Sequence, residues 1–447
     1  MLFASGADLQ SINPLLTQHP LARQVQRYVL LTTLVRYDSA LVAQPYLASR
    51  WRWSDDRRTL TFTMQPGVRW HDGVPTTARD AAWTLERARA PATGYPRLAE
   101  LGEIETVTAA DDSTLALRFA KPQARMPDVL TDLAILPAHL LDTVAPDRLR
   151  RAAWNERPVG NGPFRFVAHE PNRRWVFVAD SAFPAALGGP PRLDRFIVVV
   201  VDEPTTKLAA LTSGELDFAG IQPAHAAFVR RDPWLEVRTF PLLMTYGIVF
   251  NARRPPFDEL AARRRVSAAI DRQEIVDGYL YGFGTAATGP VPPGVPGYLP
   301  VPAPETPPRP RVGERRRFEL LTVGSGEAAL EQMVQARLAA AGFEVTIRQL
   351  ELSIYLDRVY GPARDFDAAV LGIAGDVGLG YLATLAGAAG LEAPGDPAAS
   401  QRFFADSTPV AFLYHASGLQ GANRRVKGVE MDLRGELPTV QRWWIAP

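Results

Sequence analysis

Apolar and polar positions alternate along several stretches of the chain, and this alternation predicts β-strands. In Thr59–Met64 every second residue is apolar, and Pro66-Gly67 ends the run. Ser113–Phe119 alternates in the same way. Phe196–Val201 is apolar at every position, which predicts a strand that is buried on both faces. The chain therefore contains strands of two kinds.

Helical spacing marks other stretches. From Leu21 to Leu34 apolar residues recur three and four positions apart, which predicts an amphipathic helix. A helix over Ala81–Arg89 is expected to open at Thr77, with Thr77 as its cap and Asp80 at the third position of a capping box. Both helices belong to the first part of the chain.

Strands and helices then alternate on both sides of a proline-rich stretch. The predicted elements are the strand 196–201, the helix 205–212 and a strand from Leu216, followed later by the strand 318–323, the helix 327–341 and the strand 343–349. Between the two groups, residues 290–311 hold ten prolines and read as an extended surface loop or a connector. The alternation predicts the α/β fold class.

The length of the chain, 447 residues, exceeds what one hydrophobic core usually supports, so we expect two or more lobes. Hydrophobic residues make up 47% and charged residues 22%, as in ordinary globular proteins. No apolar run reaches the length of a membrane span. The first residues, Met1–Asp8, lack an export signal and read as part of a strand. We expect a removed signal or a start site set too far downstream, with a cytoplasmic protein as the third option.

Charge and cysteine content exclude several classes of function. The formal net charge is +1, from 49 basic and 48 acidic residues, so no overall field would attract nucleic acid. The chain has no cysteine, which excludes disulfides, thiolate metal sites and a cysteine nucleophile. Its six histidines are scattered without a metal-binding pair, and no G-x-S-x-G motif is present. We expect no metal and no cofactor.

One motif keeps an enzyme hypothesis open. Gly324–Ala329 reads G-x-G-x-x-A between a predicted strand and a predicted helix, as a dinucleotide site requires. Glu327 would, however, place a carboxylate beside the phosphates. The alternative explanation is a tight turn between strand and helix. The nine tryptophans and twelve tyrosines could either pack in the core or line a ligand cleft.

Several blocks of sequence resemble one known family. Tyr46–Asp56, Thr59–Met64 and Gly67–Asp80 together look like the signature region of the family 5 extracellular solute-binding proteins. Further blocks follow in the order of that family: Val159–Phe164, Leu211–Asp217, Tyr246–Asn251, Arg265–Arg272 and Phe366–Asp376. The resemblance covers nearly the whole chain.

The resemblance implies the two-lobed α/β fold of periplasmic binding proteins, with an extra subdomain in the first lobe. The hinge lobe would comprise residues 1–35, 155–262 and 416–447. The inserted subdomain would be 36–154, and the second lobe 263–415. In this family the ligand is enclosed when the lobes close around it.

The resemblance also implies a set of ligand-binding residues. Asp376 looks like the first position of a D-x-x-D-P block whose aspartate pairs with the α-ammonium group of a peptide, but Leu379 and Gly380 depart from that block. Asp376 could instead be a structural turn residue. The other candidates are Asn251, Tyr414, His415, Tyr246 and, from the segment 17–19, His19. Their alternative role is internal hydrogen bonding within strands.

The function implied is capture of a small solute, with a peptide as the leading expectation, outside the cytoplasmic membrane. The protein would be a monomer that delivers its ligand to the permease subunits of an ABC transporter and would not be an enzyme. A sugar or a metal chelate remains open as ligand, and a receptor that only senses solute would share the fold. The rival from another class is a nucleotide-dependent enzyme that uses the Gly324 turn.

Overall fold

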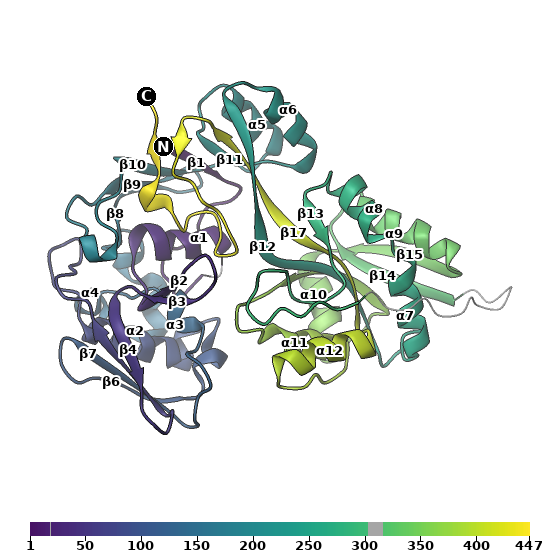
Figure 1. Ribbon diagram of the computed structural model, residues 1–447, viewed down its shortest axis with the longest axis horizontal. Helices are drawn as coiled ribbons and strands as arrows, with labels where there is room; N and C mark the ends of the chain where they lie inside the picture. Colours follow the sequence, from purple (N-terminus) through teal and green to yellow (C-terminus); the bar gives the residue numbers. More distant parts are fainter. Residues whose placement is uncertain (18, 303–315) are drawn as a thin grey trace. The chain divides into compact units, whose positions relative to one another are not determined.

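The computed structural model describes residues 1–17, 19–302 and 316–447, which form two compact units (Figure 1). Unit 1 contains Met1–Arg238 and Leu419–Pro447, and unit 2 contains Thr239–Gly418. The long strands β12 (Leu235–Phe250) and β17 (Val410–Asn423) each run from one unit into the other and are neighbours in the largest sheet. Residues 303–311 of the proline-rich stretch lie outside the described residues.

In unit 1 the sheet has the order β11-β1-β10-β9-β8. These strands are β1 (Leu2–Ser5), β8 (Phe164–Glu170), β9 (Arg174–Ala179), β10 (Arg195–Val200) and β11 (Phe218–Gly220). β1 lies between β10 and β11 and is parallel to both, and helix α5 (Pro204–Thr212) connects those two strands. The strand 196–201, the helix 205–212 and the following strand, which were predicted from the sequence, are therefore confirmed.

The prediction that β10 is buried on both faces is wrong. Phe196 and Val198 on one face are fully buried, whereas Ile197 and Val199 on the other face are only half-buried. One face of β10 packs into the main core of unit 1, and Val199 on the other face packs half-buried against a second apolar cluster that includes Leu211 of α5. The strand lies inside the sheet, between β1 and β9.

The predicted helix over residues 21–34 is shorter in the structure. Helix α1 (Pro20–Val25) continues as the π-helix η1 (Gln26–Leu30) and then stops. The carbonyl oxygen of Leu30 accepts hydrogen bonds from the backbone N–H groups of Asn161 (3.1 Å) and Gly162 (2.8 Å), and Thr32 N–H donates to Asn161 Oδ1 (2.9 Å). Asn161 and Gly162 therefore bind the backbone groups of Leu30 and Thr32 that a longer helix would use for its own hydrogen bonds.

Residues 48–119 form a second, antiparallel sheet of unit 1 with the order β4-β5-β7-β6. Its strands are β4 (Ala48–Trp53), β5 (Thr59–Met64), β6 (Ile104–Ala109) and β7 (Thr114–Phe119). The two strands predicted from alternation are thus confirmed. Helix α2 (Ala78–Arg89) has the predicted capping box, in which Asp80 Oδ2 accepts from Thr77 N–H at 2.8 Å.

Unit 1 also contains shorter elements. They are β2 (Val35–Tyr37), β3 (Ala43–Pro45), η2 (Pro91–Thr93), η3 (Leu98–Leu101), α3 (Val129–Asp132), α4 (Ala138–Leu141), η4 (Pro146–Arg151), η5 (Ala153–Asn155), η6 (Ala185–Leu187), η7 (Pro223–His225), α6 (Ala226–Arg231), β18 (Val426–Lys427), η9 (Val440–Arg442) and β19 (Trp444–Ile445).

Unit 2 continues the large sheet in the order β15-β14-β16-β12-β17. Its strands β14 (Arg316–Val323), β15 (Phe343–Leu350) and β16 (Ala368–Ala374) are joined by helices, and β14 is parallel to both neighbours. Helix α9 (Ala329–Ala340) connects β14 to β15, as predicted. The other elements are α7 (Leu260–Ala269), α8 (Arg272–Glu274), η8 (Ile275–Tyr279), β13 (Gly284–Ala286), α10 (Leu352–Tyr360), α11 (Tyr381–Ala388) and α12 (Pro397–Ser407).

The α/β fold class predicted from the pattern is confirmed. The units divide at 238/239 and 418/419, whereas the predicted second lobe ran from 263 to 415. Residues 239–262 pack with unit 2 because Ile248, Phe250 and Phe257 are part of its hydrophobic core. The division of the first lobe into subdomains stays a prediction. Among the described residues, no helix is both long enough and apolar enough to cross a membrane.

Candidate functional site

Three of the predicted ligand-binding residues lie together in unit 2. Tyr246 comes from β12, and Tyr414 and His415 come from the neighbouring strand β17. The rings of Tyr246 and Tyr414 stack with their centroids 4.8 Å apart and their planes inclined by 15°. Burial raises the pKa of the Tyr414 hydroxyl, so this side chain stays neutral. The stacked rings form an aromatic contact between the two neighbouring strands.

His415 is held by a short hydrogen-bond chain. Its Nδ1 lies 2.9 Å from Thr245 Oγ1, and that hydroxyl donates to the carbonyl oxygen of Pro290 at 3.2 Å. Because the hydroxyl has given its proton to Pro290, His415 Nδ1 carries the proton between the two side chains. Burial lowers the pKa of His415 to about 4, and the ring is neutral at pH 7.

Asp376 follows β16 and binds the start of helix α11. Its Oδ1 accepts from Gly380 N–H at 3.1 Å and its Oδ2 accepts from Tyr381 N–H at 3.2 Å. The Tyr381 hydroxyl donates to Pro290 O at 2.9 Å, so the chain of contacts extends from Asp376 to His415. A carboxylate has about four acceptor positions. Asp376 therefore has a turn role and also retains acceptor capacity for a ligand.

Asn251 and His19 lie elsewhere. Asn251 stands five residues beyond Tyr246, where its amide donates to the carbonyl oxygens of Arg364 (2.9 Å) and Phe366 (3.0 Å). In the structure Asn251 therefore forms internal hydrogen bonds, which is the alternative role given for it in the sequence analysis. His19 belongs to unit 1 and caps α1, because its Nδ1 accepts from Ala22 N–H at 3.3 Å. The backbone N–H of His19 donates to Thr17 Oγ1 at 3.1 Å, and Thr17 lines the pocket described next.

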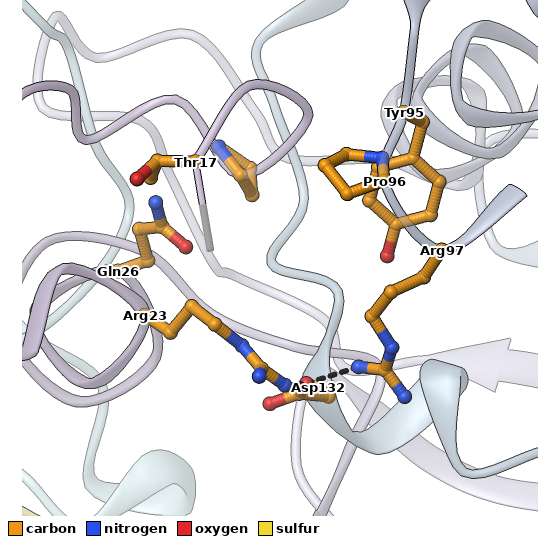
Figure 2. A pocket seen from close by; sticks show the side chains of 8 residues that line it. Thr17, Arg23, Gln26, Tyr95, Pro96, Arg97 and Asp132 are labelled. Carbon is orange, nitrogen blue, oxygen red and sulfur yellow. Dashed lines mark hydrogen bonds and ion pairs between the residues drawn. The ribbon is translucent and has the colours of Figure 1, made fainter. Parts of the chain in front are cut away.

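A pocket in unit 1 was not predicted from the sequence (Figure 2). We call it the arginine pocket, and its lining residues are Pro14, Thr17, Arg23, Gln26, Tyr95, Pro96, Arg97 and Asp132. They come from four separate segments: the loop before α1, the α1–η1 helix, the loop before η3, and the end of α3.

Asp132 is the centre of the arginine pocket. Its carboxylate, whose side chain is 9% exposed, forms ion pairs with Arg23, Arg27 and Arg97. Arg97 also forms a two-point ion pair with Glu100, at 2.5 Å and 2.7 Å. Burial, followed by the nearby charges of Arg27 and Arg97, lowers the pKa of Arg23 to about 10, and its guanidinium remains charged at pH 7.

The helical spacing of Arg23 and Arg27 was the one signal of this pocket in the sequence. Residues four apart lie on the same face of a helix, so the spacing places these two guanidinium groups side by side. The identity of that partner, Asp132, is 105 positions from Arg27 and follows from the fold alone.

The Gly324 turn is explained by local hydrogen bonds. Gly324 has a φ of +134°, a conformation that favours glycine, and its N–H donates to Leu350 O at 3.1 Å. Gln349 Nε2 closes the turn by donating to Gly326 O at 2.8 Å. Within the described residues no group of three or more histidine or acidic side chains is arranged to hold a metal ion.

The sequence of this chain matches the model of one known protein family. The family model described as "Bacterial extracellular solute-binding proteins, family 5 Middle" matches residues 42–315. A protein of Brucella ovis that is named for ABC transporter peptide binding is 32% identical over 237 residues, which are 53% of this chain and 44% of that protein. The chain thus spans about half the length of the first curated relatives it matches.

Longer matches extend over most of the chain. The "Probable di/tripeptide-binding protein 5" of Pseudomonas aeruginosa is 27% identical over 410 residues, 83% of this chain and 75% of that protein. The structure of the oligopeptide-binding protein AppA from Bacillus subtilis, solved with a nonapeptide, superposes with a TM-score of 0.80 at 20% identity and covers 100% of this chain and 99% of its own. This confirms the predicted two-lobed solute-binding fold. The comparisons give no support to a nucleotide-dependent enzyme.

Proposed function

The chain belongs to the bacterial extracellular solute-binding proteins of family 5, and we propose that it binds a peptide and delivers it to the permease of an ABC importer. The observation that carries the proposal is the match over 83% of the chain to a protein named for di- and tripeptide binding. On this proposal the protein acts on the outer side of the cytoplasmic membrane, which the word "extracellular" in the family description supports.

The residues of unit 2 support a ligand with a free amino group. Burial keeps Tyr414 and His415 uncharged at pH 7, so Asp376 supplies the negative charge among the predicted residues of this unit. A carboxylate that a ligand covers needs a cation beside it, because a buried and unpaired charge is costly. The α-ammonium group of a peptide is such a cation.

A binding screen tests the proposal. Native mass spectrometry of the purified protein and thermal unfolding with di-, tri- and longer peptides, sugars, metal chelates and nucleotides compare the ligand classes. A peptide at about a hundred times its dissociation constant should add about 2.7 kcal/mol to the free energy of unfolding. Stabilisation by a nucleotide and by none of the peptides would overturn the proposal.

Replacement of Asp376 tests its role in that site. Asp376→Asn should weaken the binding of a peptide with a free amino terminus by roughly 3 to 5 kcal/mol, because the ammonium group loses its counter-charge. The same peptide with an acetylated amino terminus should bind both proteins equally weakly. Isothermal titration calorimetry measures both affinities.

A matched control separates the ligand role of Asp376 from its turn role. Asp396 also caps a helix of unit 2, since its Oδ2 accepts from Ala399 N–H at 2.7 Å. Asp396→Asn should leave peptide affinity unchanged. If Asp376→Asn behaves like Asp396→Asn, Asp376 is a turn residue and lies outside the ligand site.

A further inference from the structure

Glu331 of unit 2 is a buried carboxylate without a positively charged partner. It lies in the first turn of α9 and is only 8% exposed. Its one hydrogen bond within the described residues comes from the hydroxyl group of Thr322 at 2.6 Å, and no arginine, lysine or histidine among them forms an ion pair with it. A buried charge that lacks a counter-charge is costly. A positively charged group beside Glu331 would remove this cost.

Three tyrosines, Tyr246, Tyr279 and Tyr414, lie around this carboxylate. Tyr279 is the last residue of η8, and η8 packs against α9. Burial and then the charge of Glu331 raise the pKa of the Tyr279 hydroxyl. Burial raises the pKa of Tyr414 as well, and the other two tyrosines and Glu331 add to that effect. We call these four residues the tyrosine–glutamate cluster.

The hydroxyl groups of the three tyrosines are free to bind a ligand. None of them has a hydrogen-bond partner among the described residues, and none is closed off from solvent. Tyr414 is only 4% exposed and Tyr279 is 37% exposed. A phenolic oxygen can accept a hydrogen bond as well as donate one. Aromatic rings, hydroxyl oxygens and a carboxylate therefore come together at a place that water can reach.

The cluster lies at the edge of the unit 2 sheet that also carries Asp376. The strands β14 and β16 are parallel, and Thr322 stands near the carboxyl end of β14, as Asp376 follows the carboxyl end of β16. Tyr246 pairs with Gly372 near that end of β16. In open α/β sheets ligands bind outside the carboxyl ends of the strands. The cluster is thus positioned for a ligand of unit 2.

The start of helix α9 explains only part of this arrangement. A carboxylate in the first turn of a helix is favoured by the helix dipole. Within the described residues, however, no backbone N–H group of α9 donates to Glu331, and no side chain caps this helix. A glutamine would accept the hydrogen bond from Thr322 without burying a charge. The charge is accounted for if a cation joins it.

The chemistry of the cluster favours an organic cation. An ammonium or guanidinium group donates charge-assisted hydrogen bonds to a carboxylate, and aromatic rings attract such cations. A calcium or magnesium ion would need more oxygen ligands than one carboxylate offers. Among the described residues, no group of three or more acidic or histidine side chains could hold a metal ion.

We propose that the tyrosine–glutamate cluster binds a positively charged side chain of the solute, with Glu331 as its counter-charge and the tyrosine hydroxyls as further acceptors. The solute is then a peptide that contains lysine or arginine, and this charge is separate from the amino terminus assigned to Asp376. The assignment of ligand class rests on the proposed peptide-binding function. The affinity of the cluster for organic cations is independent of it.

Small cations test the cluster without any knowledge of the natural ligand. The melting temperature of the wild-type protein is measured in methylammonium chloride, potassium chloride and sodium chloride at equal ionic strength. Methylammonium should stabilise the protein more than sodium does. Stabilisation by potassium and not by methylammonium would overturn the assignment to an organic cation, and equal melting temperatures in all three salts would overturn the site.

Three variants locate the effect. Glu331→Gln, which can still accept from Thr322, should abolish the difference between methylammonium and sodium, and Tyr279→Ala should reduce it. Glu344→Gln is the control, because Glu344 is an exposed glutamate of the same unit that pairs with Arg317 at 2.8 Å. If Glu344→Gln lowers the methylammonium effect as much as Glu331→Gln does, the proposal is wrong.

Peptides with and without a basic side chain connect the cluster to the ligand. In a set of tripeptides, the best lysine-containing peptide should bind the wild-type protein about tenfold more tightly than the same peptide with norleucine in place of lysine, as expected for one charge-assisted contact. In Glu331→Gln the two peptides should bind alike, whereas Asp376→Asn should retain the preference for lysine. An undiminished preference for lysine in Glu331→Gln would overturn the assignment.

The two proposals therefore fail in different ways. A methylammonium effect that Glu331→Gln removes, in a protein that binds none of the peptides, would contradict the proposed function and leave the cation site in place. Tight peptide binding that is the same for lysine and norleucine would leave the function in place and contradict the assignment of the cluster.

Discussion

Burial sets the chemical state of the side chains that surround His415. The ring is 7% exposed and its one hydrogen bond within the group, to Thr245, needs no charge. A protonated ring would lose its hydration without gaining a carboxylate in return. Burial therefore keeps the His415 ring neutral, beside the buried Tyr414 of the same strand.

The pH dependence of stability tests this state of His415. An unfolded chain binds a proton on histidine near pH 6.5, whereas the folded protein does so only at about pH 4. The unfolded state thus binds more protons between these values, and the folded state loses stability as the pH falls. The contribution of the neutral His415 ring to the free energy of unfolding is complete above about pH 6.5 and is lost by about pH 4.

The loss attributable to His415 between pH 7 and pH 5 is about 2 kcal/mol. Urea unfolding at both pH values measures it. His415→Asn, which keeps a polar group beside Thr245 and does not titrate, should reduce the fall in stability by that amount. Parallel pH profiles of the two proteins would show that His415 does not control the effect.

Some candidate residues could be predicted from the sequence and others could not. Asp376, Tyr414 and His415 could be proposed because they stand at positions that resemble a known family. Arg97 and Asp132 could not, since a charged residue on a loop looks like any solvated charge until the fold brings it to its partners. Nothing in the sequence indicates that the Gln26 amide is buried without an acceptor.

Local patterns predict those elements whose ends are determined locally. The cap of α2 depends on Thr77 and Asp80 alone, and the strands β5 and β7 alternate because one face of their sheet is buried. The end of the α1–η1 helix could not be predicted, because Asn161 binds Thr32 from 129 positions away. Tertiary hydrogen bonds there override a helical pattern that continues in the sequence.

Substitution of Gly162 tests this tertiary stop. A Cβ atom at position 162 would lie 2.6 Å from the carbonyl carbon of Leu30 and 2.7 Å from the nitrogen of Leu31, both backbone atoms. Gly162→Ala should therefore destabilise the protein by about 1 to 3 kcal/mol or more, the usual cost of overpacking. Gly326→Ala is the control, since no atom lies within 4 Å of a Cβ there. Equal unfolding midpoints of these two variants in urea would contradict the explanation.

The molecule has a separate hydrophobic core in each unit. The core of unit 1 includes Phe62, Trp70 and Phe164, and that of unit 2 includes Phe250, Phe257 and Phe318. Phe257 stacks on Phe250 at 4.6 Å and meets Phe318 edge-on at 4.9 Å. Because the two groups share no member, damage to one core should remain confined to its unit.

Cavity-forming substitutions test that independence. Phe257→Ala should cost about 3 to 5 kcal/mol and should speed hydrogen exchange in β14 and α9 while β5 and β7 stay protected. Phe62→Ala should give the reverse pattern, since Phe62 is fully buried in unit 1. Hydrogen-exchange mass spectrometry resolves the two regions. Loss of protection throughout the chain in either variant would show that the two units unfold as one.

The strands β12 and β17 have a consequence for how such a protein can diversify. Unit 2 is one uninterrupted segment, 239–418, whose two ends lie on strands that are hydrogen-bonded neighbours, while both chain termini remain in unit 1. A gene that encodes this chain can therefore exchange the whole of unit 2 with a related gene through only two recombination points. Asp376 and His415, which both belong to unit 2, would then be inherited together in one event.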